Sequence, residues 1–216
     1  MCEIACVVLC GGKSSRMGCD KALLPFGNKD LAHFMYDTYS NIFPHILLCC
    51  KTPKPQLKLP MIIESSTQHN HNAHTNTTKD MAFSPLYGIA CALQNLTGDY
   101  VAFVSVDTPF LKPQTLQNLA KQVQDLRANG GYIVQVDETN AIVHEHFLLS
   151  VWHKNTLDSL HHAIQTQNFR VGELVKHLGF LTYNVYDTLL SYNLNTPQDY
   201  QLALTQLHSQ HICDNI

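Results

Sequence analysis

Charged residues are scarce in this chain of 216 residues: they make up 14%, against 45% hydrophobic residues, and the formal net charge is −3. A chain with this balance has no broad positive surface for nucleic acid or an anionic membrane, so any cationic function has to be local. The length and the hydrophobic share are sufficient for one packed core. We therefore expect a single domain over residues 1–216, with neither nucleic acid nor a membrane among its partners.

Long apolar runs are also missing, and we expect the first residues not to form a leader sequence. No run approaches the roughly twenty residues that a membrane-spanning helix needs. The first ten residues, MCEIACVVLC, contain an acidic residue, no basic stretch and no cleavage site, which argues against a signal peptide. We therefore expect a cytoplasmic protein.

Cysteine pairs with metal-binding or redox spacing are absent, although the chain has eight cysteines. Cys2, Cys6 and Cys10 would share one face of a strand. At about 3.3 Å per residue, however, neighbours four residues apart lie roughly 13 Å from each other, so they cannot bind one metal. We expect reduced and mostly buried thiols, which behave as small hydrophobic side chains.

A glycine-rich segment follows the first apolar run. Residues 4–9 are typical of a strand buried on both faces of a parallel sheet, and LCGGKSSRMGCDK follows over residues 9–21. Open α/β sheets bind ligands at the carboxyl ends of their strands, and Gly11 and Gly12 allow a close backbone approach there. Nearby cations and hydroxyls suit phosphate. These are Lys13, Ser14, Ser15, Arg16 and Lys21.

Two common phosphate loops do not fit this segment. A Walker A loop needs a glycine five residues before Gly12, where Val7 stands, and the GxGxxG fingerprint fails because Lys13 or Ser14 takes its second glycine position. The remaining pattern, GGKSxRMGxDKxxL, resembles the signature loop of nucleotidyltransferases that activate sugars, isoprenoid precursors and the molybdenum cofactor. With its double glycine and Asp-Lys pair, it is most similar to the molybdenum cofactor guanylyltransferases.

The rest of the chain predicts alternating strands and helices, and hence an α/β fold. This is a single-domain, Rossmann-like fold with a mostly parallel central sheet flanked by helices. We expect strands at 45–50, 61–64, 100–106, 131–136 and 141–151, and helices at 28–43, from Pro85, at 113–128, at 154–166 and from Pro197. Residues 65–80 have almost nothing apolar to bury and are predicted to form a mobile surface loop. Residues 209–216 are predicted to be a flexible tail.

A second motif stands where the clearest strand ends. Residues 100–106 are continuously apolar and run into Asp107-Thr108-Pro109. Because parallel strands open onto one edge, Asp107 can face phosphates held by the glycine loop. A lone carboxylate beside a triphosphate suits Mg²⁺, and the family has a magnesium-binding Asp-x-Pro at a strand end. The alternative is that Asp107 caps the helix near Pro113 or stabilises a turn.

The resemblance implies roles for further positions. Catalytic roles fall on Arg16, Lys21 and Asp107, and Asp107 is the implied metal ligand. GTP binding falls on Leu9, Cys10, Gly11, Gly12, Lys21, Cys49, Ser65, Pro85, Leu86, Gly88 and Asp107.

Three positions depart from the family pattern. Cys49 and Ser65 stand near an expected asparagine and aspartate, with Glu64 just before Ser65, and Ser84 replaces the glycine of G-P-L-x-G. The guanine assignment therefore rests on the loop signature.

The acceptor side is implied by the sequence NLNTP at 193–197, which resembles the closing N-x-N-T-P motif of the family. There, an asparagine lies near the metal and the acceptor phosphate, which implies acceptor binding by Asn193 and Asn195. Taken alone, the segment indicates a strand, a helix N-cap and a proline at the first helical position.

His144 and His146 face one side of a predicted strand. His146 is the implied acceptor contact, and a structural histidine is the alternative.

The implied reaction is transfer of GMP from GTP to the terminal phosphate of a molybdopterin-type cofactor, with release of pyrophosphate and Mg²⁺ as cofactor. The acceptor phosphate is already ionised near neutral pH, so no general base is needed. Molybdoenzymes or cofactor-biosynthesis proteins are expected partners.

Two alternatives to this function stay open. One is a CTP-dependent cytidylyltransferase of the same fold, acting on molybdopterin, a sugar or an isoprenoid phosphate. The other is a metal-binding protein, suggested by thirteen histidines and HNHNAH at 69–74.

Overall fold

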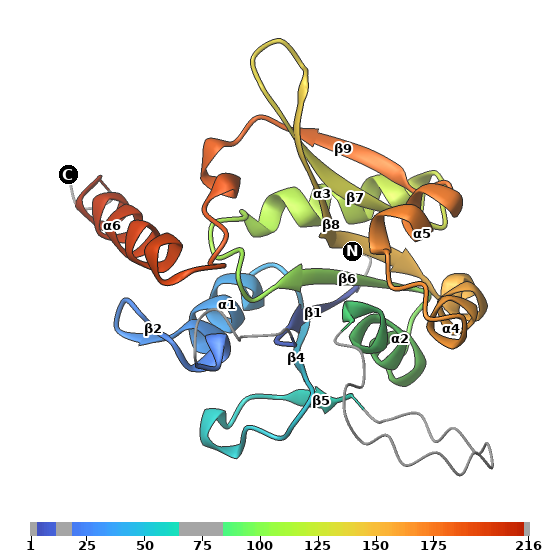
Figure 1. The fold of residues 1–216 in the computed structure, drawn as a ribbon, viewed down its shortest axis with the longest axis horizontal. Coiled ribbons are helices and arrows are strands. Elements are labelled where there is room, and N and C mark those ends of the chain that lie inside the picture. Colours follow the sequence, from blue (N-terminus) through green and yellow to red (C-terminus); the bar gives the residue numbers. More distant parts are fainter. Residues whose placement is uncertain (1–3, 12–18, 65–83, 214–216) are drawn as a thin grey trace.

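The fold is built on one central sheet of seven strands (Figure 1). The computed structural model describes residues 4–11, 19–64 and 84–213. Across the sheet, the strands follow the order β5 (Met61–Ile63), β4 (His45–Cys50), β1 (Ala5–Leu9), β6 (Tyr100–Ser105), β8 (Ile142–His153), β7 (Gly130–Val136) and β9 (Leu181–Val185).

Strand direction decides which side chains meet at the edge of this sheet. β1 pairs in parallel with β4 and β6, β4 with β5, and β7 with β9. β8 runs antiparallel to both of its neighbours, β6 and β7. The carboxyl ends of the other strands therefore share one edge with the beginning of β8. This edge collects the strand-end motifs together with His144 and His146.

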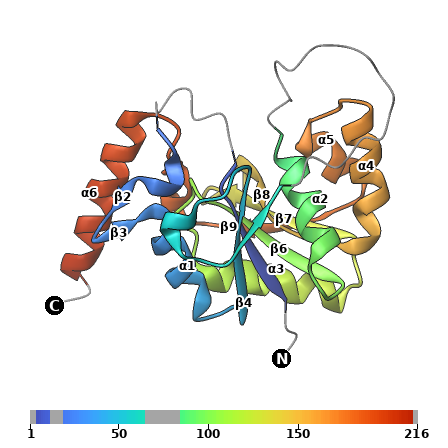
Figure 2. The same ribbon diagram turned by 90° about the horizontal axis from the view of Figure 1, so that it is seen from below.

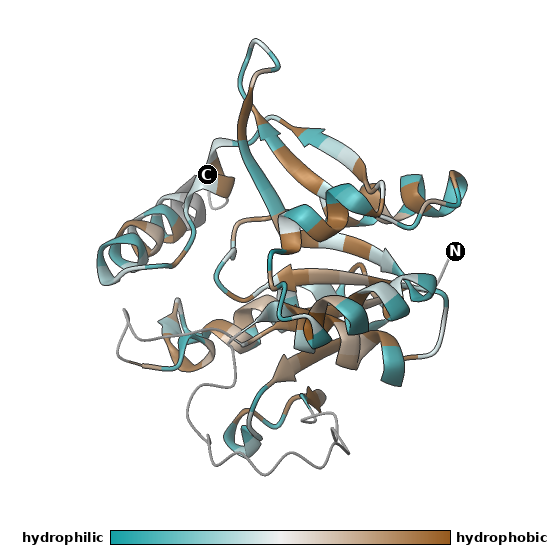
Figure 3. Ribbon diagram, turned by 45° about the vertical axis from the view of Figure 1, so that its right-hand side comes forward, coloured by the Kyte–Doolittle hydropathy of each residue, from teal (hydrophilic) through white to brown (hydrophobic). Residues whose placement is uncertain are grey.

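Helices cover both faces of the sheet (Figures 1 and 2). On one face lie α1 (Leu31–Ser40) and α3 (Pro113–Asp125), and on the other lie α2 (Pro85–Asn95), α4 (Leu157–Gln165) and α5 (Val171–His177). The two buried cores meet at the sheet: Cys6 and Val8 belong to one, and Val7 and Leu9 to the other. The central strands β1 and β6 are accordingly apolar on both faces, whereas hydrophilic residues appear on the outer helices and on parts of β8 and β9 (Figure 3). The predicted single-domain, mostly parallel α/β fold is confirmed.

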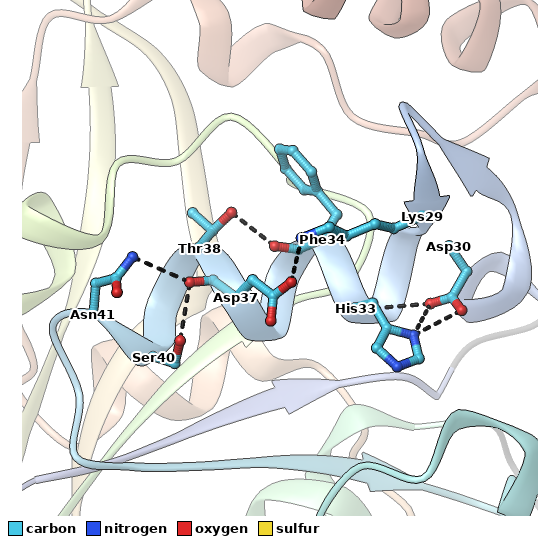
Figure 4. A network of polar contacts seen from close by, with 8 residues as sticks. All are labelled: Lys29, Asp30, His33, Phe34, Asp37, Thr38, Ser40 and Asn41. Atoms are coloured by element: carbon cyan, nitrogen blue, oxygen red, sulfur yellow. Dashed lines mark hydrogen bonds and ion pairs between the residues drawn. The ribbon is translucent and has the colours of Figure 1, made fainter.

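The first helix starts later than predicted because a short hairpin precedes it. β2 (Pro25–Phe26) pairs with β3 (Lys29–Asp30), so α1 begins at Leu31 and not at residue 28. The Asp30 carboxylate then caps α1: it accepts the His33 backbone N–H at 2.9 Å and contacts Nδ1 of the same residue at 2.8 Å (Figure 4). A neighbouring ion pair joins Lys29 to Asp37.

The carboxyl-terminal third contains elements that the sequence did not predict. α5 and β9 were not expected, and α6 (Pro197–Cys213) is helical at 209–213, where a flexible tail was predicted. Four short 3-10 helices, η2 (Lys21–Leu23), η3 (Pro55–Leu57), η4 (Lys154–Thr156) and η5 (Thr188–Ser191), complete the described elements. The predicted loop at 65–80 lies outside the described residues. Within the described ranges, no helix is long and apolar enough to cross a membrane.

Candidate active site

Two glycines make room for a carboxylate to which the sequence assigned no role. A Cβ at Gly11 would lie 3.0 Å from Oε1 of Glu64, and a Cβ at Gly88 would lie 3.1 Å from the same oxygen. Burial raises the pKa of the Glu64 carboxyl, and Lys51 opposes this shift. Glu64 follows β5 directly, so its side chain joins the ends of β1 and β5 to the first turn of α2. In the sequence, the only indication of a role for Glu64 was its position beside Ser65, where the family pattern has an aspartate.

The first turn of α2 borders the same place. Ser84, which replaces the family glycine, accepts the Leu86 backbone N–H at 3.2 Å and so caps the helix, with Pro85 at the first helical position. The buried Cys49 thiol donates to the Gly88 carbonyl at 3.7 Å. The predicted nucleotide-binding residues that the structure describes therefore lie at one edge of the sheet: Leu9, Cys10, Gly11, Lys21, Cys49, Pro85, Leu86, Gly88 and Asp107. Gly12, Arg16 and Ser65 lie outside the described residues.

Three residues from distant parts of the chain meet beside this edge. The Lys21 ammonium donates to Oδ2 of Asp107 at 2.9 Å and to Oδ1 of Asn195 at 3.4 Å. The backbone N–H of Leu194 donates to the Asp107 carbonyl at 2.9 Å, which holds the closing motif against the strand end. The glycine-loop lysine, the strand-end aspartate and the N-x-N-T-P segment thus form one cluster, which we call the lysine–aspartate cluster: Lys21, Asp107 and Asn195.

Local contacts hold the lysine and the aspartate in place. Asp20 accepts the Ala22 backbone N–H at 3.1 Å and so caps η2, the short helix that begins with Lys21. Asp20 also pairs with Lys54, whose side chain is almost fully buried.

The Asp107 side chain takes part in a tight contact with the preceding strand. Its Oδ1 accepts the Ser105 hydroxyl at 2.5 Å. The N-cap of α3 is Lys112, so the alternative that Asp107 caps this helix is wrong.

A cavity of about 420 Å³ opens next to the lysine–aspartate cluster. It is lined by residues from five segments, among them Pro85, Asp107, His146, Phe169, Asn193 and Asn195. Oδ1 of Asn193 is buried and has no hydrogen-bond partner among the described residues. A buried acceptor without a donor costs about 1–3 kcal/mol, so this oxygen is suited to a ligand.

A larger cleft of about 860 Å³ lies elsewhere, between the end of α1 and α3. None of the predicted site residues that the structure describes lines it.

His146 forms the buried wall of the cavity. Its Nε2 lies 3.4 Å from Oε1 of Gln135, and the Gln135 amide in turn donates to the Asp187 carbonyl at 2.9 Å and to the Ser191 hydroxyl at 3.0 Å. The ring of His144 lies 4.6 Å from that of His146. Burial, and to a lesser degree His144, lowers the pKa of His146 to about 4. His146 is therefore a neutral hydrogen-bonding group at pH 7.

The closing motif has no strand, contrary to one part of the prediction. Residues 192–195 are irregular, and Pro197 opens α6 as expected. Thr196 and Asp199 bond each other reciprocally: the Thr196 N–H donates to the Asp199 carboxylate at 2.8 Å, and the Asp199 N–H donates to the Thr196 hydroxyl at 3.1 Å. This capping box fixes the helix start and leaves Asn193 and Asn195 on the cavity side.

The depressed pKa of His146 predicts an acid-sensitive contribution to stability. The unfolded chain binds a proton near pH 6.5, whereas the folded chain does so only near pH 4, so the contribution is complete above pH 6.5 and is lost as pH falls toward 4. We expect His146→Gln to remove up to about 3 kcal/mol of the fall in unfolding free energy between these values. Urea denaturation at several pH values measures it, with the exposed His208→Gln as control. Equal pH slopes for wild type and His146→Gln would contradict the assignment.

The mostly parallel sheet, the glycine-bearing strand end and the lysine–aspartate cluster at the carboxyl edge define a nucleotidyltransferase-type α/β domain. Residues 6–178 match the profile of the family described as MobA-like NTP transferase domain, and the chain belongs to this family. It is 31% identical to a molybdenum cofactor guanylyltransferase of Helicobacter pylori over 94% of this chain and 92% of that protein. It is 27% identical to one of Campylobacter jejuni over 95% and 97%.

Solved structures show the same fold. The molybdopterin-guanine dinucleotide biosynthesis protein A of Archaeoglobus fulgidus superposes with a TM-score of 0.72 at 20% identity, over 99% of this chain and 100% of that one. The 2-C-methyl-D-erythritol 4-phosphate cytidylyltransferase of Thermus thermophilus gives a TM-score of 0.66 at 15% identity, over 95% and 99%. The predicted membership of the nucleotidyltransferases is confirmed.

Proposed function

We propose that this enzyme transfers GMP from GTP to the terminal phosphate of a molybdopterin-type cofactor and releases pyrophosphate. The observation that carries the proposal is the lysine–aspartate cluster, which joins a phosphate-loop lysine to a strand-end carboxylate at the mouth of a cavity. The relatives that cover nearly the whole chain are guanylyltransferases, which favours GTP over CTP.

Glu64 is our candidate for recognition of the base. Guanine presents two N–H donors side by side, the ring N1–H and the 2-amino group, and a carboxylate accepts both. Glu64 is the carboxylate packed between Gly11, which follows β1, and Gly88 in the first turn of α2. It would supply the acceptor that the family pattern places at the position of Ser65, one residue further along the chain.

The cavity beside Asp107 is our candidate for the acceptor site. Asn193 offers a buried oxygen to an N–H or O–H donor, and neutral His146 can bond either a donor or an acceptor. Phe169 supplies an apolar wall for a ring system. A bound pterin phosphate would thus have its phosphate near Lys21 and its ring toward Phe169.

Asp107 fits the role of a magnesium ligand. Mg²⁺ prefers oxygen donors and needs only one or two carboxylates, because phosphates and water complete its shell. Asp107 and the amide oxygens of Asn193 and Asn195 are such donors, and the Asp107 carboxylate already accepts a cation, the Lys21 ammonium. Bound Mg²⁺ would neutralise phosphate charge. Among the described residues, no three His, Cys, Asp or Glu side chains converge as another metal site.

The chemistry then requires alignment more than proton transfer. An oxygen of the acceptor phosphate attacks the α-phosphorus of GTP, the bond to the β-phosphate oxygen breaks, and pyrophosphate leaves with the electron pair. Lys21 stabilises the negative charge that moves onto the leaving oxygen. Asp20 positions Lys21 through the cap of η2.

Nucleotide protection against thermal unfolding tests this function. A ligand that binds the folded protein stabilises it by RT ln(1 + [L]/Kd), so we expect GTP with Mg²⁺ to raise the Tm more than ATP, CTP or UTP. A larger shift with CTP would favour the cytidylyltransferase alternative.

Glu64→Gln serves as the specificity variant in the same assay. It replaces one of the two acceptors by a donor, so it should reduce the GTP shift and leave the ATP shift unchanged. Glu173→Gln, which alters an exposed carboxylate on α5, is the matched control. A parent-like GTP shift in Glu64→Gln would remove Glu64 from the base site.

A further inference from the structure

Two thiols face each other where β1 and β4 end. Leu9 pairs with Cys49 in the parallel register, and the Cys10 backbone N–H donates to the Cys49 carbonyl at 2.8 Å, which places Cys10 opposite Cys50. Both side chains point to the face covered by α1: Cys50 belongs to that core, and Cys10 packs against it. The Cys10 thiol donates to the Val8 carbonyl at 3.6 Å, and the register puts the Cys50 side chain beside it on the same face.

This arrangement meets the distance requirement of a disulfide. Adjacent strands lie about 4.8 Å apart, and disulfides join Cα atoms that are roughly 4.4–6.8 Å apart. Both cysteines are free, so a bond would need rotation of the side chains and only small backbone shifts. We propose that Cys10 and Cys50 are a modification site, at which a peroxide forms a reversible disulfide that weakens nucleotide binding.

The surroundings of the pair suit this reaction. Cys10 is the more exposed of the two. The neighbouring Cys10 thiol and the charge of Lys54 lower the pKa of Cys50, although burial opposes them. The neighbouring Cys50, together with burial, raises the pKa of Cys10. Cys50 is therefore the thiol of the pair that loses its proton more readily and attacks a peroxide, and Cys10 is the neighbouring thiol that completes the disulfide.

The atoms and electrons of the reaction balance in two steps. The Cys50 thiolate attacks one peroxide oxygen; the O–O bond breaks, and hydroxide leaves as Cys50 becomes a sulfenic acid. The Cys10 sulfur then attacks the Cys50 sulfur, the S–O bond breaks, and hydroxide takes the Cys10 proton and leaves as water. Two thiols are oxidised by two electrons in total, and the peroxide is reduced.

The bond would act on the nucleotide site through its direct neighbours. Gly11 follows Cys10, and the Cys50 carbonyl accepts the Glu64 backbone N–H at 2.8 Å. Gly11 and Glu64 are packed so closely that a Cβ on Gly11 would lie 3.0 Å from the carboxylate. A shift of either cysteine therefore changes the spacing between Gly11 and Glu64. This consequence rests on the proposed function, whereas formation of the disulfide does not.

The test compares the reduced and peroxide-treated full chain in three forms: wild type, Cys50→Ala and Cys91→Ala. Cys91 is a buried cysteine of α2 whose thiol bonds the Ile63 carbonyl, so Cys91→Ala is the matched control. Mass spectrometry of a non-reduced tryptic digest detects a link between peptides 1–13 and 30–51, and fragment ions assign it to Cys10 and Cys50. Titration calorimetry gives the Kd for GTP before oxidation, after it, and after dithiothreitol.

We expect the link in wild type and Cys91→Ala, and its absence in Cys50→Ala. The Kd for GTP should rise at least tenfold where the link forms and return after dithiothreitol, while Cys50→Ala keeps its affinity throughout. Absence of the link in the folded wild type overturns the proposal, and so does a link without a change in Kd. If the reduced wild type fails to bind GTP, the proposed function fails, and the mass spectrum by itself decides whether the disulfide forms.

Discussion

Asp107→Asn is expected to reduce pyrophosphate release at least a hundredfold while the protein stays folded. The substitution keeps the shape of the side chain and an acceptor for the Ser105 hydroxyl, but it removes the negative charge that faces Lys21. A neutral amide is a poor ligand for Mg²⁺ beside a triphosphate. The lost ion pair is partly exposed, so the unfolding free energy should fall by no more than about 1 kcal/mol.

The measurement is a magnesium titration of pyrophosphate release with GTP and molybdopterin. The variant should need more magnesium for any remaining activity, and its urea denaturation should match that of the parent. Asp37→Asn removes an exposed carboxylate on α1 and controls for the change in net charge. Parent-like activity of folded Asp107→Asn at limiting magnesium would take Asp107 out of the site.

The strands that carry the site could be predicted because each is a continuous apolar run that is long enough to be recognised as a strand in the sequence. Residues 45–50 and 100–105 form the expected strands, and the Asp107 motif follows the second of them. Parallel pairing of β1 with β6 then brings both strand-end motifs to one edge, which confirms the spatial argument made from sequence. The Lys21 to Asp107 contact is its direct result.

The direction of β8 could not be predicted in this way. A strand buried within a sheet shows the same apolar run whichever way it points, so only its pairing with β6 and β7 reveals that it is antiparallel. Because of this direction, His146 lies at the sheet edge that carries the candidate active site. The edge strand β9 escaped prediction because LTYNV is short and only half-buried, and thus lacks a continuous apolar run.

Buried polar contacts were harder still to foresee. Gln135 joins His146 to the segment before Asn193, and it lies in β7 among apolar neighbours. Glu64 meets Gly11 and Gly88 only after three separate segments have folded together. Such contacts depend on the tertiary packing of side chains, which sequence spacing does not encode.

Lys21→Ala is expected to lower kcat more than tenfold at saturating GTP. Its ammonium stabilises charge that grows on the leaving phosphate as the bond to the α-phosphorus breaks, so its loss should raise the barrier to the chemical step more than it weakens GTP binding. Lys29→Ala removes an exposed lysine of the β2–β3 hairpin and should leave kcat unchanged. A parent-like kcat in folded Lys21→Ala would contradict the role of the lysine.

The double variant separates two explanations of that result. If Lys21 and Asp107 act on the same phosphate charge, the Lys21→Ala/Asp107→Asn enzyme should lose much less activity than the product of the two single losses, because residues that act as a unit are not additive. If Lys21 serves only to hold the Asp107 carboxylate through their 2.9 Å contact, Lys21→Ala should have no effect once Asp107 is already asparagine. A residual effect of Lys21→Ala in the Asp107→Asn background would therefore show that the ammonium itself contacts the reacting phosphates.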